Sequence, residues 1–465
     1  MPRSGLIALP PELLTEVCSY LCWHCQGGVD WHTTVIREFK DNAYNFRTDS
    51  KPLLWRQEKA ALAGLNQTCR VLHAAAQPLL YHYLHTSAGF ALYRFVRTLL
   101  KRPDLQKGVF AVEVGGVVGV DRSDIHPTPR RITEAVEFHL RGWDLVYNDL
   151  DPEAEGKPIE YSALVSVLLR LTPNLEHAHF HLPGLVSFET HVQPAASPLP
   201  SLKSLAFSND GNGLLLDLAA PILWLAPNLE VLHCHDCTNV SEEFPTCPFY
   251  ETLNSNNPAP LQNLVELGLT NTALLNDCFR NLLRAVGTKL SKVGICQKGG
   301  VIEDWDLDFD EVLAALRPWT QTLRELLFLD RGMALSHPPH RLRGLDILRD
   351  FQALEVLQVQ EAFFDFYGYF GPKEEALTSI LPPSIRELRL WGYSSLTPAL
   401  QSLVIASRAG QFPHLRRIGI DDQGFEEFEP DGDAARELRE VAACFRSAGV
   451  DFVVHEHKGA EDTEF

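Results

Sequence analysis

A short apolar phrase recurs nine times between residues 175 and 420. It consists of an aliphatic residue, two variable residues, a second aliphatic residue, one variable residue and a third apolar residue, as in Leu323-Arg-Glu-Leu326-Leu-Phe328. Successive copies start between 26 residues apart (Leu264 to Leu290) and 35 residues apart (Leu229 to Leu264). A phrase repeated at this period indicates an array of similar units, each of which buries its apolar face against its neighbours. We therefore expect function on an extended surface rather than in one catalytic pocket.

Each copy of the phrase predicts a strand that follows a helix. The second and third apolar positions are two residues apart, so they lie on one face of a strand. Apolar residues at helical spacing precede several strands, as in the run Leu214, Leu218, Ile222 and Leu225. Less regular copies at 109–114 and at Gly449–His455, the second after a helix at Ala434–Ala448, extend the array. Between Val114 and Leu175 there is room for one divergent repeat.

This pattern resembles leucine-rich repeats of the ribonuclease-inhibitor-like type. The resemblance covers most of residues 88–465. It implies an α/β fold, a solenoid with a curved parallel sheet and outer helices.

Residues 1–87 lack the phrase and are expected to form a separate helical unit. Leu9-Pro10-Pro11-Glu12-Leu13-Leu14 predicts a helix start, followed by an apolar stripe that continues through Val17 and Leu21. A second stripe lies on a later helix and consists of Leu62, Leu65, Cys69, Leu72 and Ala76. The segment 26–56 is an inserted loop between the two helices, and long surface insertions cost little closure entropy.

The two stripes resemble an F-box, whose family opens with Leu-Pro-x-Glu-Leu-Leu. Thr68-Cys69-Arg70 and Gln77-Pro78-Leu79-Leu80-Tyr81 extend the resemblance to fungal members of that family. It implies that this unit binds a Skp-type adaptor and, through it, a cullin. The adaptor-binding residues that it implies are Leu9, Pro10, Leu13, Leu14, Val17, Leu62, Leu65, Cys69 and Leu72.

Composition favours an intracellular protein that binds other proteins. The formal net charge of −19 argues against nucleic-acid binding, because phosphate contacts need a basic surface. No long apolar run or charged-then-apolar leader occurs, so neither a membrane span nor a secretory signal is expected. Ten scattered cysteines favour a reducing compartment, that is, the cytoplasm, the nucleus or both.

The cysteine pairs do not predict a cofactor. Cys22-Trp-His-Cys25 and Cys234-His-Asp-Cys237 each match half of a zinc signature. Cys234 and Cys237, however, also fit positions of the repeat, and the spacing of Cys18, Cys22 and Cys25 is typical of a packed helical face. No Gly-x-Ser-x-Gly, P-loop or His-Glu-x-x-His motif occurs. We therefore expect no metal, no cofactor and no catalytic activity of the chain itself.

Polar residues that alternate with the apolar positions are candidates for substrate binding. Alternation places them on the exposed face of the sheet. Histidines in the first half are expected to line a ligand groove, and Arg389 and Trp391 belong to the residue types that dominate interface energy. In the alternative reading, Arg386 and Arg389 pair with Glu355 and Glu387, and Trp391 packs beneath a loop. The candidate substrate-binding residues are His179, His181, His233, His235, Gln358, Arg389, Trp391 and Arg417.

Two loops are further candidates. The aromatic segment Phe363–Phe370 is either a binding hot spot or a local cluster, and the acidic segment Phe425–Asp433 is expected to be a solvated connector.

Together the two resemblances imply the substrate-recognition subunit of a Skp-cullin-F-box ubiquitin ligase, in which the repeats bind an unknown protein substrate. Two alternatives remain open at this point. One is a leucine-rich-repeat scaffold that acts outside any ligase, and the other is a metal-binding or redox protein built on the Cys and His clusters.

Overall fold

The structure is a computed structural model of the 465-residue chain. It describes residues 9–22, 24–26, 53–86, 89–114, 161–182, 199–209, 214–215, 220–238, 261–272, 274, 276–297, 309–330, 345–360, 373–391, 397–422 and 433–456. The chain divides into two compact units, Met1–Gln262 and Asn263–Phe465. This division falls inside the predicted repeat region, whereas the sequence predicted a boundary between residues 87 and 88.

Helices open the first unit. α1 (Pro11–Ser19) has a proline in its first turn, where a helix start tolerates one. α3 (Leu53–Thr68) and α4 (Arg70–Leu80) are separated by Cys69, whose extended backbone interrupts the helix. The prediction of one continuous helix through this stripe is therefore wrong. The helices pack around one apolar core, which consists of Leu14, Cys18, Cys22, Leu62, Leu72, Ala75, Ala76 and Leu79.

Parallel strands alternate with helices through the rest of the first unit. Their order is β1-β2-β3-β4-β6, so each strand lies beside the next one along the chain, and a separate small sheet pairs β5 with β7. The elements are β1 (Tyr83–Thr86), α5 (Gly89–Lys101), η3 (Pro103–Gly108), β2 (Ala111–Val114), α7 (Tyr161–Leu171), β3 (His177–Leu182), β4 (Ser204–Asn209), β5 (Leu214–Leu215), α8 (Ala220–Leu225), β6 (Val231–His235) and β7 (Cys237–Thr238).

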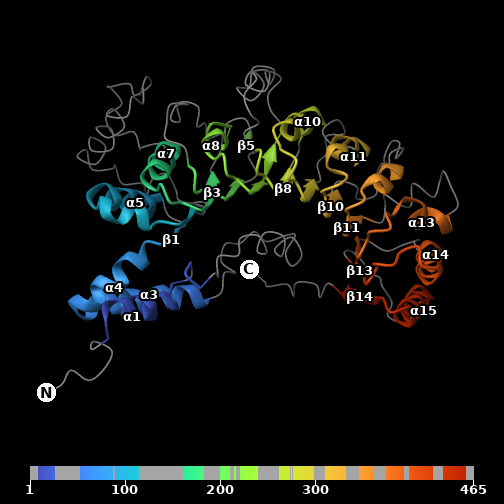
Figure 1. Ribbon diagram of the computed structural model, residues 1–465, viewed down its shortest axis with the longest axis horizontal. Coiled ribbons are helices and arrows are strands. Elements are labelled where there is room, and N and C mark those ends of the chain that lie inside the picture. Colours follow the sequence, from blue (N-terminus) through green and yellow to red (C-terminus); the bar gives the residue numbers. More distant parts are fainter. Residues whose placement is uncertain are drawn as a thin grey trace, which may run out of the picture. The chain divides into compact units, whose positions relative to one another are not determined.

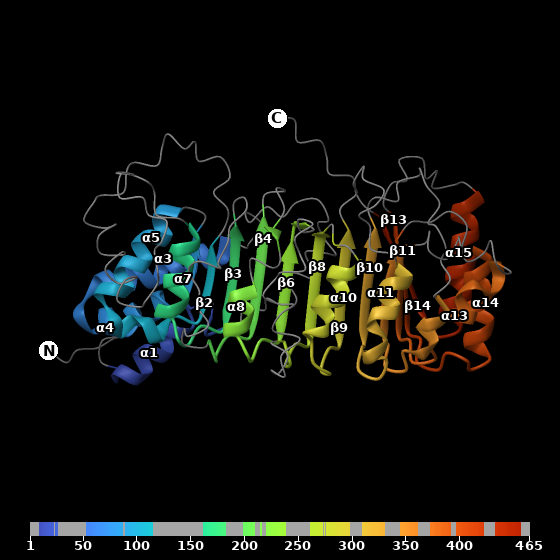
Figure 2. The same ribbon diagram turned by 90° about the horizontal axis from the view of Figure 1, so that it is seen from above.

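The second unit continues the same alternation, with the parallel order β8-β9-β10-β11-β12-β13-β14. Figure 1 shows α5, α7 and α8 along one side of the strands of the first unit, with α1, α3 and α4 grouped apart from them, and the helices of the second unit along one side of its strands; Figure 2 gives the view from above. The elements are β8 (Glu266–Thr272), α10 (Asn276–Arg284), β9 (Lys292–Gln297), α11 (Phe309–Leu316), η7 (Arg317–Trp319), β10 (Glu325–Asp330), η8 (Leu345–Asp350), β11 (Val356–Gln360), η9 (Lys373–Glu375), α13 (Ala376–Ile380), β12 (Glu387–Trp391), α14 (Thr397–Arg408), β13 (Arg417–Asp422), α15 (Asp433–Ser447) and β14 (Asp451–Glu456).

The apolar phrase sets the register of the sheet. Leu357, the second apolar position of its copy, pairs with Leu326 on one side and Leu388 on the other. The third positions pair in the same way, as Val359 does with Phe328 and Leu390. All six residues are buried beneath the helices. The prediction that each copy forms a parallel strand with its apolar side toward the core is confirmed for all nine copies.

In several repeats, the polar residue just before the phrase forms a side-chain hydrogen bond to a backbone carbonyl in the turn of the preceding repeat. Asn174 donates its side-chain N–H to the carbonyl of Lys107 at 2.8 Å, and Asn228 donates to the carbonyl of Pro200 at 2.8 Å. Two hydroxyl groups of the second unit bond in the same way, namely Thr322 to the carbonyl of Leu290 and Ser384 to the carbonyl of Leu354. These bonds satisfy carbonyl groups in the turns where the sheet ladder does not reach.

Three details differ from the prediction. β2 pairs directly with β3, so the divergent repeat expected between Val114 and Leu175 adds no strand between them. The helix expected from Leu214 begins only at Ala220, because Leu214 and Leu215 pair instead with β7. β1 is an additional strand that the sequence did not predict. No helix in the described ranges is long and apolar enough to span a membrane.

Candidate functional site

Helix α1 carries an apolar stripe on its outer face. Leu9, Leu13 and Val17 keep 36%, 45% and 36% of their surface exposed, and Tyr20, just after the helix, keeps 68%. Leu13 and Val17 are four residues apart on α1, so their side chains line up along one edge of the helix, and Leu9 and Tyr20 lie just before and just after it. Leu14 and Cys18, on the inner face, are buried in the helical core. α1 therefore has two apolar faces, and of these the described residues cover only the inner one.

The predicted adaptor-binding residues fall into three groups. Leu9, Pro10, Leu13 and Val17 are exposed and accessible to a partner. Leu65 and Cys69 are partly buried against the helical core. The remaining residues, Leu14, Leu62 and Leu72, are buried inside it. These three residues were predicted to contact the adaptor. Their burial does not fit that role, because a side chain with almost no exposed surface cannot contact a partner.

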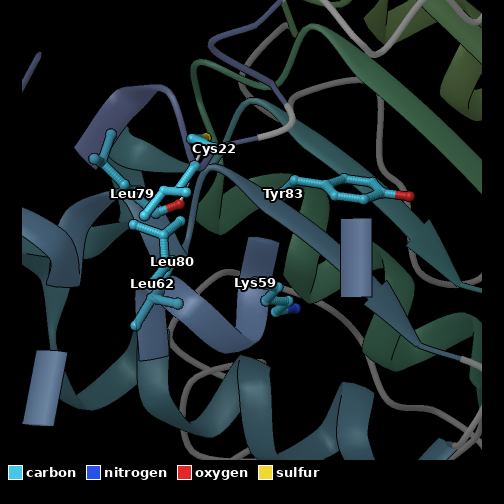
Figure 3. Close-up of a pocket in the computed structure, with 7 residues that line it drawn as sticks. Cys22, Lys59, Leu62, Leu79, Leu80 and Tyr83 are labelled. Carbon is cyan, nitrogen blue, oxygen red and sulfur yellow. Dashed lines mark hydrogen bonds between the residues drawn. The ribbon is translucent and has the colours of Figure 1, made fainter. Parts of the chain in front are cut away.

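A small recess lies beside the helical core, with about 290 Å³ of empty space that is partly open to solvent. Figure 3 shows Cys22 and Leu79 on one side of it and the Lys59 side chain near its opposite end. Burial lowers the pKa of Lys59. The residues around the recess are Leu21, Cys22, Lys59, Leu62, Leu79, Leu80 and Tyr83.

Two thiols and two imidazoles meet at the edge of the helical core. The ligand atoms of Cys22, His24, Cys25 and His82 all lie within 4.8 Å of one another. Cys22 and Cys25 do not share a helical face, because α1 ends at Ser19 and both residues lie in the turns that follow. The prediction of a helical face is therefore wrong for these two residues, whereas the predicted packing is confirmed for Cys22, which is buried in the helical core, and is wrong for the exposed Cys25. Both parts of the prediction are confirmed for Cys18, which lies in α1 and is buried.

The surroundings shift the pKa values of three members of this cluster, His24, Cys25 and His82, toward their uncharged forms. Burial, together with the nearby ring of His24, lowers the pKa of His82 to about 4. The pKa of His24 is also lowered by burial, against the opposing charge of Glu176. The pKa of the Cys25 thiol is raised, first because its sulfur is shielded from water and second because Cys22 lies beside it. The residue as a whole is nevertheless exposed. At neutral pH the His82 ring is therefore a neutral imidazole, the form that binds metal ions.

A second polar cluster lies on the sheet face away from the helices in the first unit. Glu113 on β2 is buried and accepts a hydrogen bond of 2.5 Å from the hydroxyl of Tyr83 on β1. The carboxylate lies 3.9 Å from His85 and 3.8 Å from His179, on the strands to either side. His179 in turn lies 3.1 Å from the hydroxyl of Ser208 on β4. These contacts surround one buried carboxylate with polar partners from the two neighbouring strands, β1 and β3.

The histidines that were predicted to line an exposed groove are less exposed in the structure than expected. His179 and His233 are buried, and His235 is half-buried with its ring 3.1 Å from Asp236. Alternation predicts which face a residue occupies, but other parts of the chain decide whether that face is covered. The side chain of His181 lies outside the described residues.

The predicted patch on the second unit consists mainly of internal contacts. Arg389 donates to Glu387 at 2.5 Å, and Arg417 lies 4.0 Å from the same carboxylate. Gln358 and Trp391 are buried, and the indole Nε1 of Trp391 has no hydrogen-bond partner in the described part of the chain. Arg386 pairs with Glu355 at 3.3 Å. The ion pairs Arg386–Glu355 and Arg389–Glu387, which the alternative interpretation predicted, are therefore present.

Several other candidates lie outside the described residues. Among them are the segment 361–372, which includes the aromatic run, and the segment 423–432, which holds most of the acidic connector. Cys234 is buried at its repeat position, and the side chain of Cys237 is not among those described.

Comparisons with known proteins add little to this picture. No family model matches the chain, and no curated protein matches it either. The crystal structure of a structural-genomics target protein from Bacteroides fragilis is similar over 55% of this chain and 66% of that one, at 13% identity and a TM-score of 0.28. A likeness of this size bears on neither the fold nor the function of this chain.

Sequence reasoning missed the residues that close both clusters of the first unit. Tyr83 and His85 lie on the strand β1, whose residues Tyr83-Leu84-His85 alternate as the later strands do. That alternation is the signal that would have revealed the strand. No local signal joins His82 to Cys22, because 60 residues separate them in the chain.

Proposed function

We propose that this protein is the substrate-recognition subunit of a Skp-cullin-F-box ubiquitin ligase, and that α1 binds the Skp-type adaptor. The observation that carries the proposal is the set of exposed residues Leu9, Leu13, Val17 and Tyr20, on and just beside a helix whose opposite face is already packed. Exposed aliphatic residues aligned on one helix edge are typical of a surface that a partner covers. The motif Leu9-Pro10-Pro11-Glu12-Leu13-Leu14, which resembles the opening of an F-box, supports the assignment of these residues to adaptor binding.

The helical core supports the proposal in a second way. It is small, and its described residues come from α1, α3, α4 and the turns just after α1. Small helical units bury little surface by themselves and gain stability from a partner. The helices on either side of the segment predicted as an insertion, α1 and α3, both contribute residues to this core.

The strands and helices that follow fit the role of a substrate-binding surface. We infer that they form a leucine-rich-repeat solenoid with a curved sheet, in which successive strands present a row of side chains opposite the helices. Extended faces of this kind bind proteins in solenoids. The substrate would be a protein, and the chemistry of ubiquitin transfer would belong to other subunits of the ligase.

One pull-down tests the proposal. The intact protein is captured from cell extract and probed for a Skp-type adaptor and a cullin, beside a variant with Leu9, Leu13 and Val17 replaced by alanine. We expect both partners with the wild type and neither with the variant. Capture of other proteins by the wild type without adaptor or cullin would contradict the proposal and favour a scaffold outside any ligase.

A further inference from the structure

The cluster of Cys22, His24, Cys25 and His82 has the composition of a tetrahedral metal site. It brings together two thiols and two imidazoles, and no other group of three or more possible ligands occurs among the described residues. Three ligands come from the turns after α1, and the fourth comes from the residue just before β1. Two sulfur and two nitrogen ligands in this arrangement are typical of zinc.

The distances between the ligand atoms match those around a single ion. Bond lengths of about 2.3 Å to sulfur and about 2.0 to 2.1 Å to nitrogen place tetrahedral ligand atoms about 3.3 to 3.8 Å apart. The Nδ1 atom of His82 lies 3.7 Å from the Cys22 sulfur and 3.4 Å from the Cys25 sulfur. The Nδ1 atom of His24 lies 3.9 Å from the Cys25 sulfur. Small side-chain shifts would therefore bring all four atoms onto one ion.

The surrounding residues hold the ligands in place. The carbonyl of His82 accepts hydrogen bonds from the backbone N–H groups of Phe110 and Ala111, at 3.0 and 2.9 Å. The ring of Phe110 stacks on His24, with centroids 4.8 Å apart, and meets the ring of His82 edge-on at 4.9 Å. Cys22 is buried in the helical core, whereas Cys25 is exposed and leaves a path from solvent. Ligands fixed by an outer layer of contacts are a mark of metal sites.

We propose that Cys22, His24, Cys25 and His82 bind one Zn²⁺ ion as a structural site. Four protein ligands complete a tetrahedron, so the ion has no open position for a substrate. Binding replaces the two S–H protons by two Zn–S bonds and releases both protons to solvent, with no change of oxidation state. The ion would join the turns after α1 to the start of β1, and it would thereby fix the proposed docking helix to the first strand of the sheet.

Metal analysis of the intact protein tests this proposal. We expect about one zinc per chain by inductively coupled plasma mass spectrometry, and at least a tenfold loss in the variants Cys25→Ser and His82→Asn. His73→Asn, an exposed histidine on α4, and Cys444→Ser, an exposed thiol on α15, are matched controls that should keep the zinc. Replacement by Co²⁺ should give the visible absorption of a tetrahedral thiolate site, which disappears in Cys25→Ser.

The wild-type protein alone is enough to overturn the proposal, whether or not the variants fold. Purified protein that contains no zinc and gives no cobalt spectrum when titrated with Co²⁺ under reducing conditions would overturn it. So would a disulfide between Cys22 and Cys25 in protein isolated with its thiols blocked. Zinc content that is equal in His82→Asn and in His73→Asn would also overturn it.

Discussion

Leu13 and Leu14 are neighbours on α1 with opposite environments, and their replacement should separate binding from folding. Leu13 is 45% exposed on the outer stripe, whereas Leu14 is fully buried in the helical core. Leu13→Ala should weaken adaptor binding and leave the fold intact. Leu14→Ala should destabilise the helical core, because it leaves a cavity among residues that do not close around it.

The magnitudes follow from the exposed surface. Fully burying a leucine side chain is worth about 1.5 to 3 kcal/mol, so covering the 45% of Leu13 that is exposed is worth about 0.7 to 1.4 kcal/mol, or about 3- to 10-fold in Kd. The same reasoning gives about 0.5 to 1.1 kcal/mol for each of Leu9 and Val17, which are 36% exposed. The triple alanine variant should therefore bind about 20- to 400-fold more weakly. Leu14→Ala should lower the free energy of unfolding by about 2 to 5 kcal/mol.

Calorimetric titration with purified adaptor measures the Kd, and urea unfolding followed by circular dichroism measures the free energy of unfolding. Ile405→Ala is the matched control, because Ile405 is an aliphatic residue on α14 in the second unit that is 67% exposed. It should change neither quantity by more than about 0.5 kcal/mol. The reasoning is refuted if the triple variant binds like the wild type, or if Ile405→Ala weakens binding as much as the triple variant does.

Two further predictions concern stability. Tyr83→Phe removes the hydroxyl that donates to the buried Glu113 carboxylate. It should lower the free energy of unfolding, measured in urea, by about 1.5 to 3 kcal/mol. A change below about 0.5 kcal/mol would show that this hydrogen bond contributes little. Gly449→Ala should cost about 1 to 2 kcal/mol because its φ of +79° disfavours any side chain, whereas Gly64→Ala inside α3 should stabilise by about 0.5 to 1 kcal/mol. No atom lies within 4 Å of a Cβ added at either glycine, so equal effects in thermal unfolding would contradict this backbone explanation.

The regular part of the fold could be predicted because its signal is local and repeated. The second and third apolar positions lie two residues apart in every copy, and this spacing fixes which side of each strand is buried. Leu326, Leu357 and Leu388 accordingly pair across neighbouring strands. The closing helix and strand were also predicted close to their observed bounds, α15 and β14.

The candidate sites could be predicted only in part, because their geometry depends on contacts between distant segments. The spacing of Cys18, Cys22 and Cys25 fits a helix, but the helix ends at Ser19 and the last two thiols turn toward His82. Alternation correctly places His179 opposite the helices, yet it carries no information about the residues that bury it. The pattern on α1 likewise does not separate Leu13 from Leu14, because both are apolar and only packing against α4 decides which one is covered.

Hydrogen–deuterium exchange of the intact protein, with and without purified Skp-type adaptor, tests the central proposal most directly. The exposed stripe predicts that adaptor slows exchange in α1 and in the residues up to Tyr20, while β8 to β14 exchange at unchanged rates. The triple variant of Leu9, Leu13 and Val17 should show no such protection at the same adaptor concentration. The absence of any protection in α1 with saturating adaptor, or protection confined to the strands, would contradict the proposal that this helix binds the adaptor.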